Sequence, residues 1–202
     1  PGGRIQNNPG LKVLAIIGGG KMDDKIPLLE ALSKNVAGIY IAGGNINSIL
    51  NDSALHDYID RIAKNTERAN IYLMKDGLAA TDLNSIPIYQ SADGTRDRER
   101  NFYDIGLQSI VELDSLIKEY DMIFWNGTLG VVENKLYSYG STTLVKLLMQ
   151  SGKKVIVGGG DTSGFVMENF DHNFYYVSTG GGASLSSLSD EEGLVGLRQF
   201  AS

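Results

Sequence analysis

Short apolar segments alternate with helical patterns along this chain, and that alternation sets the strongest limit on its fold. Six segments of the 202-residue sequence have the character of strands: residues 11–17, 38–42, 70–74, 122–125, 153–157 and 174–177. Their apolar residues run continuously, which is typical of strands that are buried on both faces of a sheet. Strands that alternate with helices favour parallel pairing through right-handed crossovers. The sequence therefore predicts a three-layer α/β/α Rossmann-like domain with a six-stranded, mainly parallel sheet.

The segments between the strands carry helical spacing. Apolar residues three and four positions apart fill 55–63, after a possible cap at Asp52 or Ser53, and similar stripes fill 110–117 and 144–148. The last of these is expected to open at Ser141 or Thr142, and residues 24–34 predict a further helix with Pro27 in its first turn.

Residues 77–103 fit this alternation poorly. They contain Pro87, a turn-like Asp93-Gly94 and a run of charges of alternating sign at 95–100. We expect an irregular excursion at the rim of the sheet, with the charged run in solvent. No linker or repeat divides the chain, so residues 1–202 are interpreted as a single domain.

Composition excludes several classes of protein. The chain has no cysteine, which removes disulfides, thiolate metal sites and cysteine nucleophiles. Its net charge of −6 and the lack of a basic cluster argue against nucleic-acid binding. No apolar segment has the length of a membrane span, and His56 and His172 lack the spacing of metal ligands.

Glycines are concentrated where the predicted strands end. Five strands are followed by glycine turns, at residues 18–20, 43–44, 127–130, 158–160 and 180–182. Strand ends of one kind meet at one edge of a parallel sheet, and ligands of such sheets bind outside the carboxyl ends. Any single turn could reflect only the geometry of a strand-to-helix connection. The set of five predicts a site for a phosphorylated ligand, because helices that start there present free amides to an anion.

Two familiar phosphate motifs do not match these turns. A P-loop requires a glycine six residues before its lysine and a serine or threonine directly after it. This chain has Ala15 six residues before Lys21, and Met22 follows Lys21. The dinucleotide fingerprint requires a third glycine where Asp23 and Ser163 stand. A nicotinamide-dependent dehydrogenase is therefore a disfavoured alternative.

Charged residues in the turns are compatible with a nucleoside triphosphate. Lys21 and Lys25 are four residues apart, so we expect them on one face at the start of a helix, although exposed surface lysines are the alternative. Asp161 could cap the next helix or hold Mg²⁺, and Glu133 could contact a ribose or only solvent. Trp125 ends a buried strand and is expected in the core.

These turns, in this order, resemble the carboxy-terminal, nucleotide-binding half of the phosphoglycerate kinases. The resemblance extends from about Pro9 to Phe200, and its carriers are residues 18–26, 104–106, 125–133, 158–162 and 178–185. Several positions depart from the family pattern, among them Asn45, Leu107, Thr128 and Val132. The chain is thus similar to a divergent member of this family.

The resemblance implies reversible phosphoryl transfer between 1,3-bisphosphoglycerate and ADP, with Mg²⁺ and ADP or ATP as the bound species. It assigns Lys21, Gly181 and Gly182 to the phosphoryl group in transfer, Asp161 to the metal, and Lys25 to the nucleotide phosphates. Glu133 is assigned to the ribose. The other residues implied in nucleotide binding are Gly18, Gly19, Gly20, Gly43, Gly44, Asn126, Gly127, Thr128, Gly130, Gly159, Gly160, Asp161, Thr162, Thr179 and Gly180.

In that family a basic amino-terminal domain binds 3-phosphoglycerate or 1,3-bisphosphoglycerate, and the sequence contains no such half. Residues 1–8 are interpreted as a remnant of the connection between domains. We expect a monomeric cytoplasmic chain that binds adenine nucleotide but turns over slowly alone, because the acid substrate is not positioned. The alternative is a phosphate-binding module with a regulatory or scaffolding role and no transfer chemistry.

Overall fold

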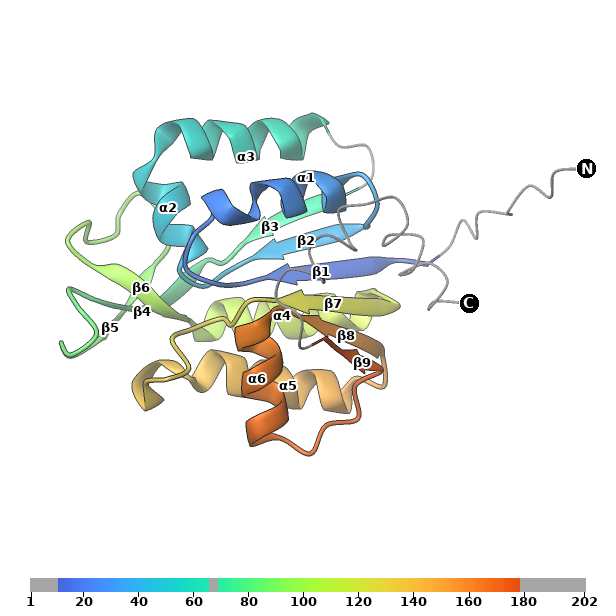
Figure 1. Ribbon diagram of the computed structural model, residues 1–202. Coiled ribbons are helices and arrows are strands. Elements are labelled where there is room, and N and C mark those ends of the chain that lie inside the picture. The colour runs from blue at the N-terminus through green and yellow to red at the C-terminus, as the bar shows by residue number, and fades with distance from the viewer. Residues whose placement is uncertain (1–10, 66–68, 179–202) are drawn as a thin grey trace, which may run out of the picture.

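A six-stranded parallel sheet forms the centre of the computed structural model, which describes residues 11–65 and 69–178 (Figure 1). The strands lie in the order β3-β2-β1-β7-β8-β9, and every neighbouring pair is parallel. Their bounds are β1 Val13–Ile17, β2 Gly38–Ile41, β3 Asn70–Leu73, β7 Met122–Asn126, β8 Lys154–Gly158 and β9 Tyr176–Val177. The predicted α/β fold with a six-stranded parallel sheet is confirmed.

The sheet reverses its direction of growth between β1 and β7. Strand β1 pairs with β2 on one side and with β7 on the other, so the first three strands extend one way and the last three the other. Crevices in open sheets of this kind form where the strand order reverses, outside the carboxyl ends. The turns after β1 and β7 are therefore the centre of any site at this rim.

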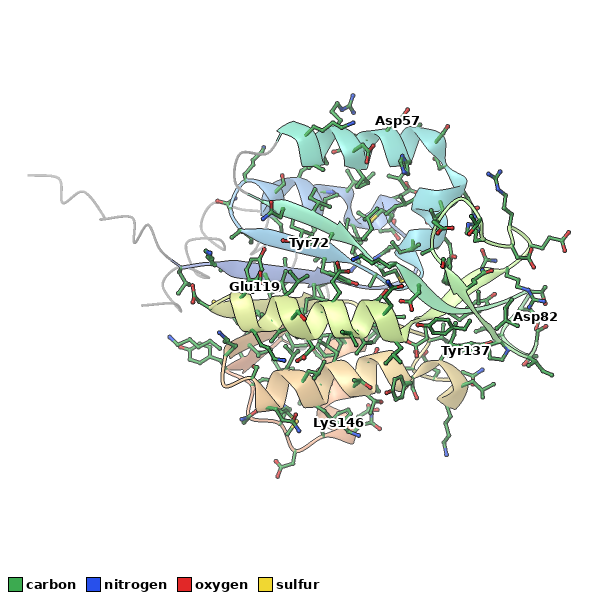
Figure 2. The ribbon with its side chains drawn as sticks, turned by 180° about the vertical axis from the view of Figure 1, so that it is seen from behind. Asp57, Tyr72, Asp82, Glu119, Tyr137 and Lys146 are labelled. Atoms are coloured by element: carbon green, nitrogen blue, oxygen red, sulfur yellow. The ribbon has the colours of Figure 1, made fainter. Side chains whose placement is uncertain are left out.

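Helices cover both faces of the sheet, with α1 on one face and α4 and α5 on the other (Figures 1 and 2). Between them the central strands are fully enclosed, as Leu14, Ile16 and Phe124 are all 0% exposed. Exclusion of these side chains from water is the main source of stability for the sheet. The helices are α1 Ile26–Ser33, α2 Asn45–Asn51, α3 Ser53–Asn65, α4 Leu107–Glu119, α5 Tyr139–Gln150 and α6 Gly160–Asn169, with 3-10 turns η1 Asp23–Lys25 and η2 Lys135–Tyr137. None of the helices within the described ranges is both long and apolar enough to cross a bilayer.

The sequence offered two possible first residues for each of two helices, and the structure shows where each helix begins. The carboxylate of Asp52 accepts hydrogen bonds from the amides of Ala54 at 2.9 Å and Leu55 at 3.2 Å, so Asp52 caps α3. Helix α5 begins at Tyr139, earlier than expected. The hydroxyl of Ser141 instead accepts a hydrogen bond from the amide of Leu129 at 2.9 Å, in the turn after β7.

The prediction of an irregular excursion at residues 77–103 was wrong. Strands β4 Asp76–Ala80, β5 Ile88–Ser91 and β6 Asn101–Ile105 form a second, antiparallel sheet in the order β5-β4-β6. It lies at the carboxyl rim of the main sheet, since β4 follows β3 after a short connection (Figure 1). Its strands contain glycine, aspartate and exposed positions, so they lack the continuous apolar pattern that revealed the main strands.

Polar side chains join the second sheet to α2. Arg96 belongs to the charged run expected in solvent, but it is only 8% exposed and donates hydrogen bonds to the side chain of Asn51 and the carbonyl of Arg100. The side chain of Asn47 exchanges two hydrogen bonds with the backbone of Phe102, at 2.8 and 2.9 Å. The second sheet is therefore anchored to a helix that begins in the rim.

Candidate functional site at the carboxyl rim

The turns that follow β1 and β7 are in direct contact through their backbones. The amide of Gly18 donates to the carbonyl of Asn126, and that of Gly19 donates to the carbonyl of Thr128, both at 2.8 Å. A methyl group placed on Gly18 would lie 2.3 Å from the carbonyl oxygens of Gly127 and Thr128. Glycine is thus required at position 18 for the two turns to approach each other.

The turn after β2 joins the same contact. The amide of Asn45 donates to the carbonyl of Gly19 at 2.9 Å, and its side-chain amide donates to the carbonyl of Gly18 at 2.8 Å. Asn45 is 0% exposed. The sequence singled it out only as a departure from the family pattern, because nothing in a lone asparagine after a glycine pair indicates that it links two turns.

The turn after β8 is linked to the turn after β7. The hydroxyl of Thr162 accepts a hydrogen bond from the amide of Gly127 at 2.8 Å. Gly159 has a φ of +92° and stands at the start of α6, a conformation that favours glycine. Four of the five predicted turns therefore come together. The fifth, with Thr179, Gly180, Gly181 and Gly182, lies outside the described residues.

The glycines of the rim divide into two groups. In the first group glycine is required, either because a methyl group would lie 2.2 to 2.9 Å from backbone atoms or because φ is positive. Its members are Gly18, Gly19, Gly43, Gly44, Gly127, Gly130 and Gly159. Gly20 and Gly160 differ, since a methyl group at either position would meet no atom within 4 Å. Their backbones border open space at the starts of the segments that lead into α1 and α6.

Lys25 and Asn126 form the main polar contact between the turns and the first helix. The Lys25 ammonium donates to Oδ1 of Asn126 at 2.5 Å. Burial lowers the pKa of Lys25, while the nearby carboxylates of Asp161 and Asp24 act in the opposite direction. Asn126 is 0% exposed, and its Nδ2 has no hydrogen-bond partner among the described residues. An unpaired buried donor next to a cation is an arrangement that an anionic oxygen would complete.

Lys21 does not share a helix face with Lys25. It lies exposed in the coil after β1, ahead of the 3-10 turn that begins at Asp23, and the α-helix itself starts only at Ile26. The expectation of one face assumed that α-helical spacing began at Lys21, whereas the chain is still leaving the glycine turn there. Lys21 remains beside the rim with its side chain in solvent.

The two acidic candidates are both exposed. Asp161 stands in the first turn of α6, where Gly159 is the cap and makes no side-chain bond, so the capping alternative for Asp161 was wrong. Glu133 lies in the turn between β7 and η2. No group of three potential metal-ligating side chains occurs within residues 11–65 and 69–178. A lone carboxylate of this kind fits Mg²⁺ that is held mainly by the phosphates of a ligand.

Trp125 and the histidines are placed as expected. Trp125 is 0% exposed, and its indole nitrogen donates to the carbonyl of Gly127 at 2.8 Å. His56 is exposed on α3, and the His172 ring stacks on Phe174 with centroids 5.3 Å apart. Neither histidine belongs to the rim.

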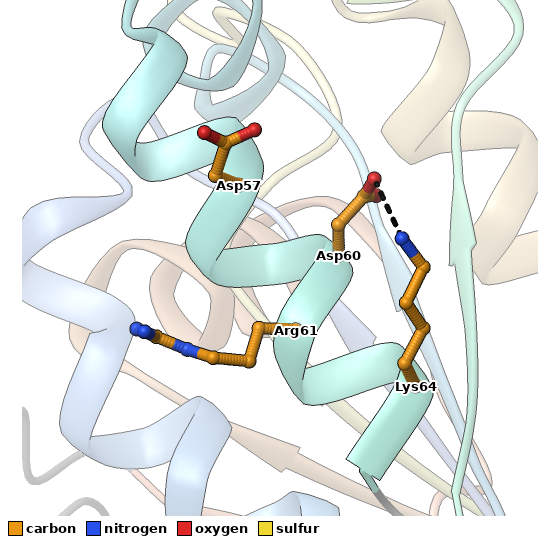
Figure 3. A pocket seen from close by; sticks show the side chains of 4 residues that line it. All are labelled: Asp57, Asp60, Arg61 and Lys64. Atoms are coloured by element: carbon orange, nitrogen blue, oxygen red, sulfur yellow. Dashed lines mark ion pairs between the residues drawn. The ribbon is translucent and has the colours of Figure 1, made fainter.

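A surface hollow lies on α3, away from the rim (Figure 3). It is lined by Asp57, Asp60, Arg61 and Lys64, and Lys64 pairs with Asp60 at 3.8 Å. All four side chains belong to one helix, and none was a candidate from the sequence. Mixed charges that partly neutralise one another give this hollow no preference for an anion.

Comparison with known proteins gives a consistent result. A family model described as phosphoglycerate kinase matches residues 3–191. The phosphoglycerate kinase of Wigglesworthia glossinidia brevipalpis is 33% identical over 190 residues, which cover 89% of this chain and 48% of that protein. The corresponding protein of Mycoplasmoides gallisepticum is 30% identical over 205 residues, with 92% and 50% covered. The chain thus spans about half the length of the curated relatives it matches.

Solved structures agree with the fold described above. A phosphoglycerate kinase from Coxiella burnetii aligns with a TM-score of 0.78 and 28% identity, over 94% of this chain and 53% of that one. One from Pyrococcus horikoshii aligns with a TM-score of 0.73 at 18% identity, over 98% and 53%, and it supports the fold alone.

Proposed function

Since the chain belongs to the phosphoglycerate kinase family, we propose that it binds Mg²⁺ with ADP or ATP at the carboxyl rim. This site would serve the reversible transfer of a phosphoryl group between 1,3-bisphosphoglycerate and ADP. The observation that carries the proposal is the contact between Lys25 and the buried Asn126, whose Nδ2 lacks a partner in the described chain, at the point where the strand order reverses.

The surroundings of this contact favour phosphate. Helices α1 and α6 both begin at the rim, and their first amides carry partial positive charge. Gly20 and Gly160 leave open space where an oxygen could approach the backbone. We assign the nucleotide phosphates to this space, with Lys25 and Asn126 as donors and the ribose toward Glu133.

Mg²⁺ would be held by Asp161 together with the phosphates. When bound, the ion would offset negative charge on the nucleotide phosphates while the phosphoryl group moves between the nucleotide and the carboxyl oxygen of the acid substrate. Asp161 also influences the charge state of Lys25. The chain's own contribution is to position the nucleotide and to offset negative charge, and no covalent intermediate is needed.

Lys21 and the turn at Gly181 and Gly182 are proposed to act on the phosphoryl group itself. The exposed position of Lys21 leaves its side chain free to reach a group that arrives at the rim from solvent. A cation that gains contact with phosphate only during transfer would raise the rate without tightening the binding of nucleotide. Lys21→Ala is therefore expected to reduce transfer more than it reduces affinity for ADP.

Titration calorimetry with ADP and ATP in the presence of Mg²⁺ tests the binding proposal. We expect Lys25→Ala to weaken affinity about tenfold or more, which corresponds to the loss of roughly one charge-assisted hydrogen bond. Lys34→Ala is the matched control, because Lys34 lies at the other end of α1 and is exposed. Equal affinities for all three proteins, or no binding by the wild type, would contradict the proposal.

Transfer chemistry needs a separate assay. The chain is incubated with ATP, Mg²⁺ and 3-phosphoglycerate, alone and with the amino-terminal half of a related kinase supplied in trans. We expect transfer to rise when the second half is added, because it would position the acid substrate. Nucleotide binding with no transfer under either condition would favour the regulatory or scaffolding alternative.

A further inference from the structure

The carboxylate of Asp104 is buried beneath the segment that leaves the rim after β7. Asp104 lies on β6 of the second sheet and is 0% exposed. Its Oδ2 accepts a hydrogen bond from the amide of Gly140 at 3.0 Å, and its Oδ1 accepts one from the amide of Ile105 at 2.9 Å. The first of these bonds ties the second sheet to the start of α5.

Two glycines surround this carboxylate closely. A methyl group on Gly130 would lie 2.3 Å from Oδ1 of Asp104, and one on Gly140 would lie 2.4 Å from the same atom. Neither glycine has a positive φ. Asp104 is one of two close neighbours at each position, since the same methyl groups would lie 2.2 Å from the carbonyl oxygen of Tyr137 at Gly130 and 2.2 Å from Cγ2 of Ile105 at Gly140. Both ends of the segment 130–140 therefore pack on Asp104 without room for a side chain.

Among the described residues, no cation balances the charge of Asp104. No ion pair within the described ranges involves its carboxylate, and the groups around it are backbone amides at the positive end of α5. Burial raises its pKa to about 7, and hydrogen bonds from Gly140, Ile105 and Tyr139 oppose that rise. A buried acid in such surroundings is costly, so its contacts with the segment must be well ordered to retain it.

The segment above Asp104 leads directly into the proposed nucleotide site. Its first residues, Gly127 and Thr128, contact the turn after β1, and Glu133 stands near its middle. The amide of Val131 donates to the carbonyl of Tyr103 at 2.9 Å, next to Asp104 on the same strand. Tyr137, whose ring lies 5.3 Å from that of Tyr103, brings the far end of the segment against the second sheet (Figure 2).

We propose that Asp104 is a positioning residue, which holds the segment 127–140 in the shape that the nucleotide needs. Asp104 touches no ligand in this proposal, which rests on the proposed function of the rim. Asp104 acts through its hydrogen bond with the amide of Gly140 and through close packing on Gly130. These contacts hold one side of the segment, while Gly18 and Gly19 contact its first residues. Loss of this support lets the rim contacts of Gly127 and Thr128 shift, which weakens nucleotide binding.

Asp76 provides a matched comparison within the same sheet. It is 2% exposed, and its carboxylate accepts hydrogen bonds from the amides of Gln108 at 3.0 Å and Ser109 at 2.8 Å, at the start of α4. Asp76 and Asp104 therefore both accept hydrogen bonds from amides at the start of a helix, Asp76 at α4 and Asp104 at α5. Only the helix held by Asp104 is preceded by a segment of the proposed site.

Asp104→Asn and Asp76→Asn are compared in the full chain by calorimetry with Mg²⁺ and ADP. Both variants are expected to lower the midpoint of urea unfolding. Asp104→Asn alone should weaken ADP binding about tenfold, while Asp76→Asn stays within about twofold of the wild type. Trp125, the only tryptophan of the chain, donates to Gly127, so its emission in the native state should change only in Asp104→Asn.

The possible results are distinct. Equal affinities in the two variants, or an unchanged Trp125 emission in Asp104→Asn, would overturn the positioning role. A wild type that binds no ADP would overturn the proposed function, and the role of Asp104 with it.

Hydrogen exchange in the wild type tests the same role even if Asp104→Asn fails to fold. Saturating Mg²⁺ and ADP should slow exchange at Gly140 about tenfold, and unchanged exchange there would also overturn the inference.

Discussion

The main sheet and the second sheet meet at one rim but are held together by different means. The central strands of the main sheet are apolar and enclosed on both faces, and the turns after β1 and β7 are in contact through backbone atoms. The second sheet is joined to its surroundings by buried polar side chains: Asp76, Arg96 and Asp104. One region forms the proposed site, and the other binds the starts of α4 and α5.

The difference shows how stability and position are divided at the rim. Apolar burial is strong but not directional, so it holds the layers together without fixing a loop to within an ångström. Hydrogen bonds that buried carboxylates accept from backbone amides have a defined geometry and can set the position of a helix start. We therefore expect changes in the glycine contact to affect folding most, and changes in the second sheet to affect the site at a smaller cost in stability.

The largest expected effect is that of Gly127→Ala. Its φ is +91°, and a methyl group there would lie 2.2 Å from the carbonyl oxygen of Gly18. We expect a loss of about 4 kcal/mol or more in the free energy of unfolding, or a chain that does not fold. Gly152→Ala is the control, because Gly152 has a φ of +67° but open space around it. Urea unfolding should show a loss of about 1–2 kcal/mol for Gly152→Ala. Equal losses of stability in the two variants would mean that position 127 requires glycine because of its backbone conformation, and not because of contact between the turns.

Arg96→Ala should have the next largest effect. It leaves the side chain of Asn51 and the carbonyl of Arg100 without their donor. We expect a loss of about 2–3 kcal/mol in the free energy of unfolding, as is usual when buried polar groups lose a charged partner. Arg98→Ala removes an exposed arginine from the same charged run and should stay within about 0.5 kcal/mol. Similar effects of the two changes in thermal or urea unfolding would contradict the anchoring role of Arg96.

A smaller effect should appear in the pH dependence of stability. The pKa of Asp104 in the folded chain is about 7, above the ordinary value of 3.8. The folded state therefore binds the proton more tightly than the unfolded state does, and the contribution of Asp104 to stability is greatest below pH 4 and is lost as the pH rises through 7. Relative to Asp104→Asn, the wild type should become steadily less stable between pH 4 and pH 8, with most of the loss below pH 7. Urea unfolding at a series of pH values measures this, and a difference that does not change with pH would contradict it.

Much of the fold could be predicted from the sequence, because continuous apolar strands and helical stripes are local patterns. The six strands of the main sheet were found within a few residues, and the glycine turns indicated the rim. The second sheet was missed, since Asp76 begins β4 and Asp104 lies within β6, where aspartate breaks the apolar pattern. The helix-start amides that they bind, those of Ser109 and Gly140, lie 33 and 36 residues away in the chain. No pattern of spacing reveals such a contact, and the same is true of Asn45 and Thr162 in the rim.

The central claim is that the carboxyl rim binds the phosphates of a nucleotide. Amide chemical shifts of the isotope-labelled chain, recorded during titration with Mg²⁺ and ADP, test it residue by residue. The account predicts the largest changes at Gly20, Lys25 and Gly160, where open backbone and the ammonium group border the same space. Changes concentrated on α3 between Asp57 and Lys64, or no change at the rim at saturating ADP, would contradict it.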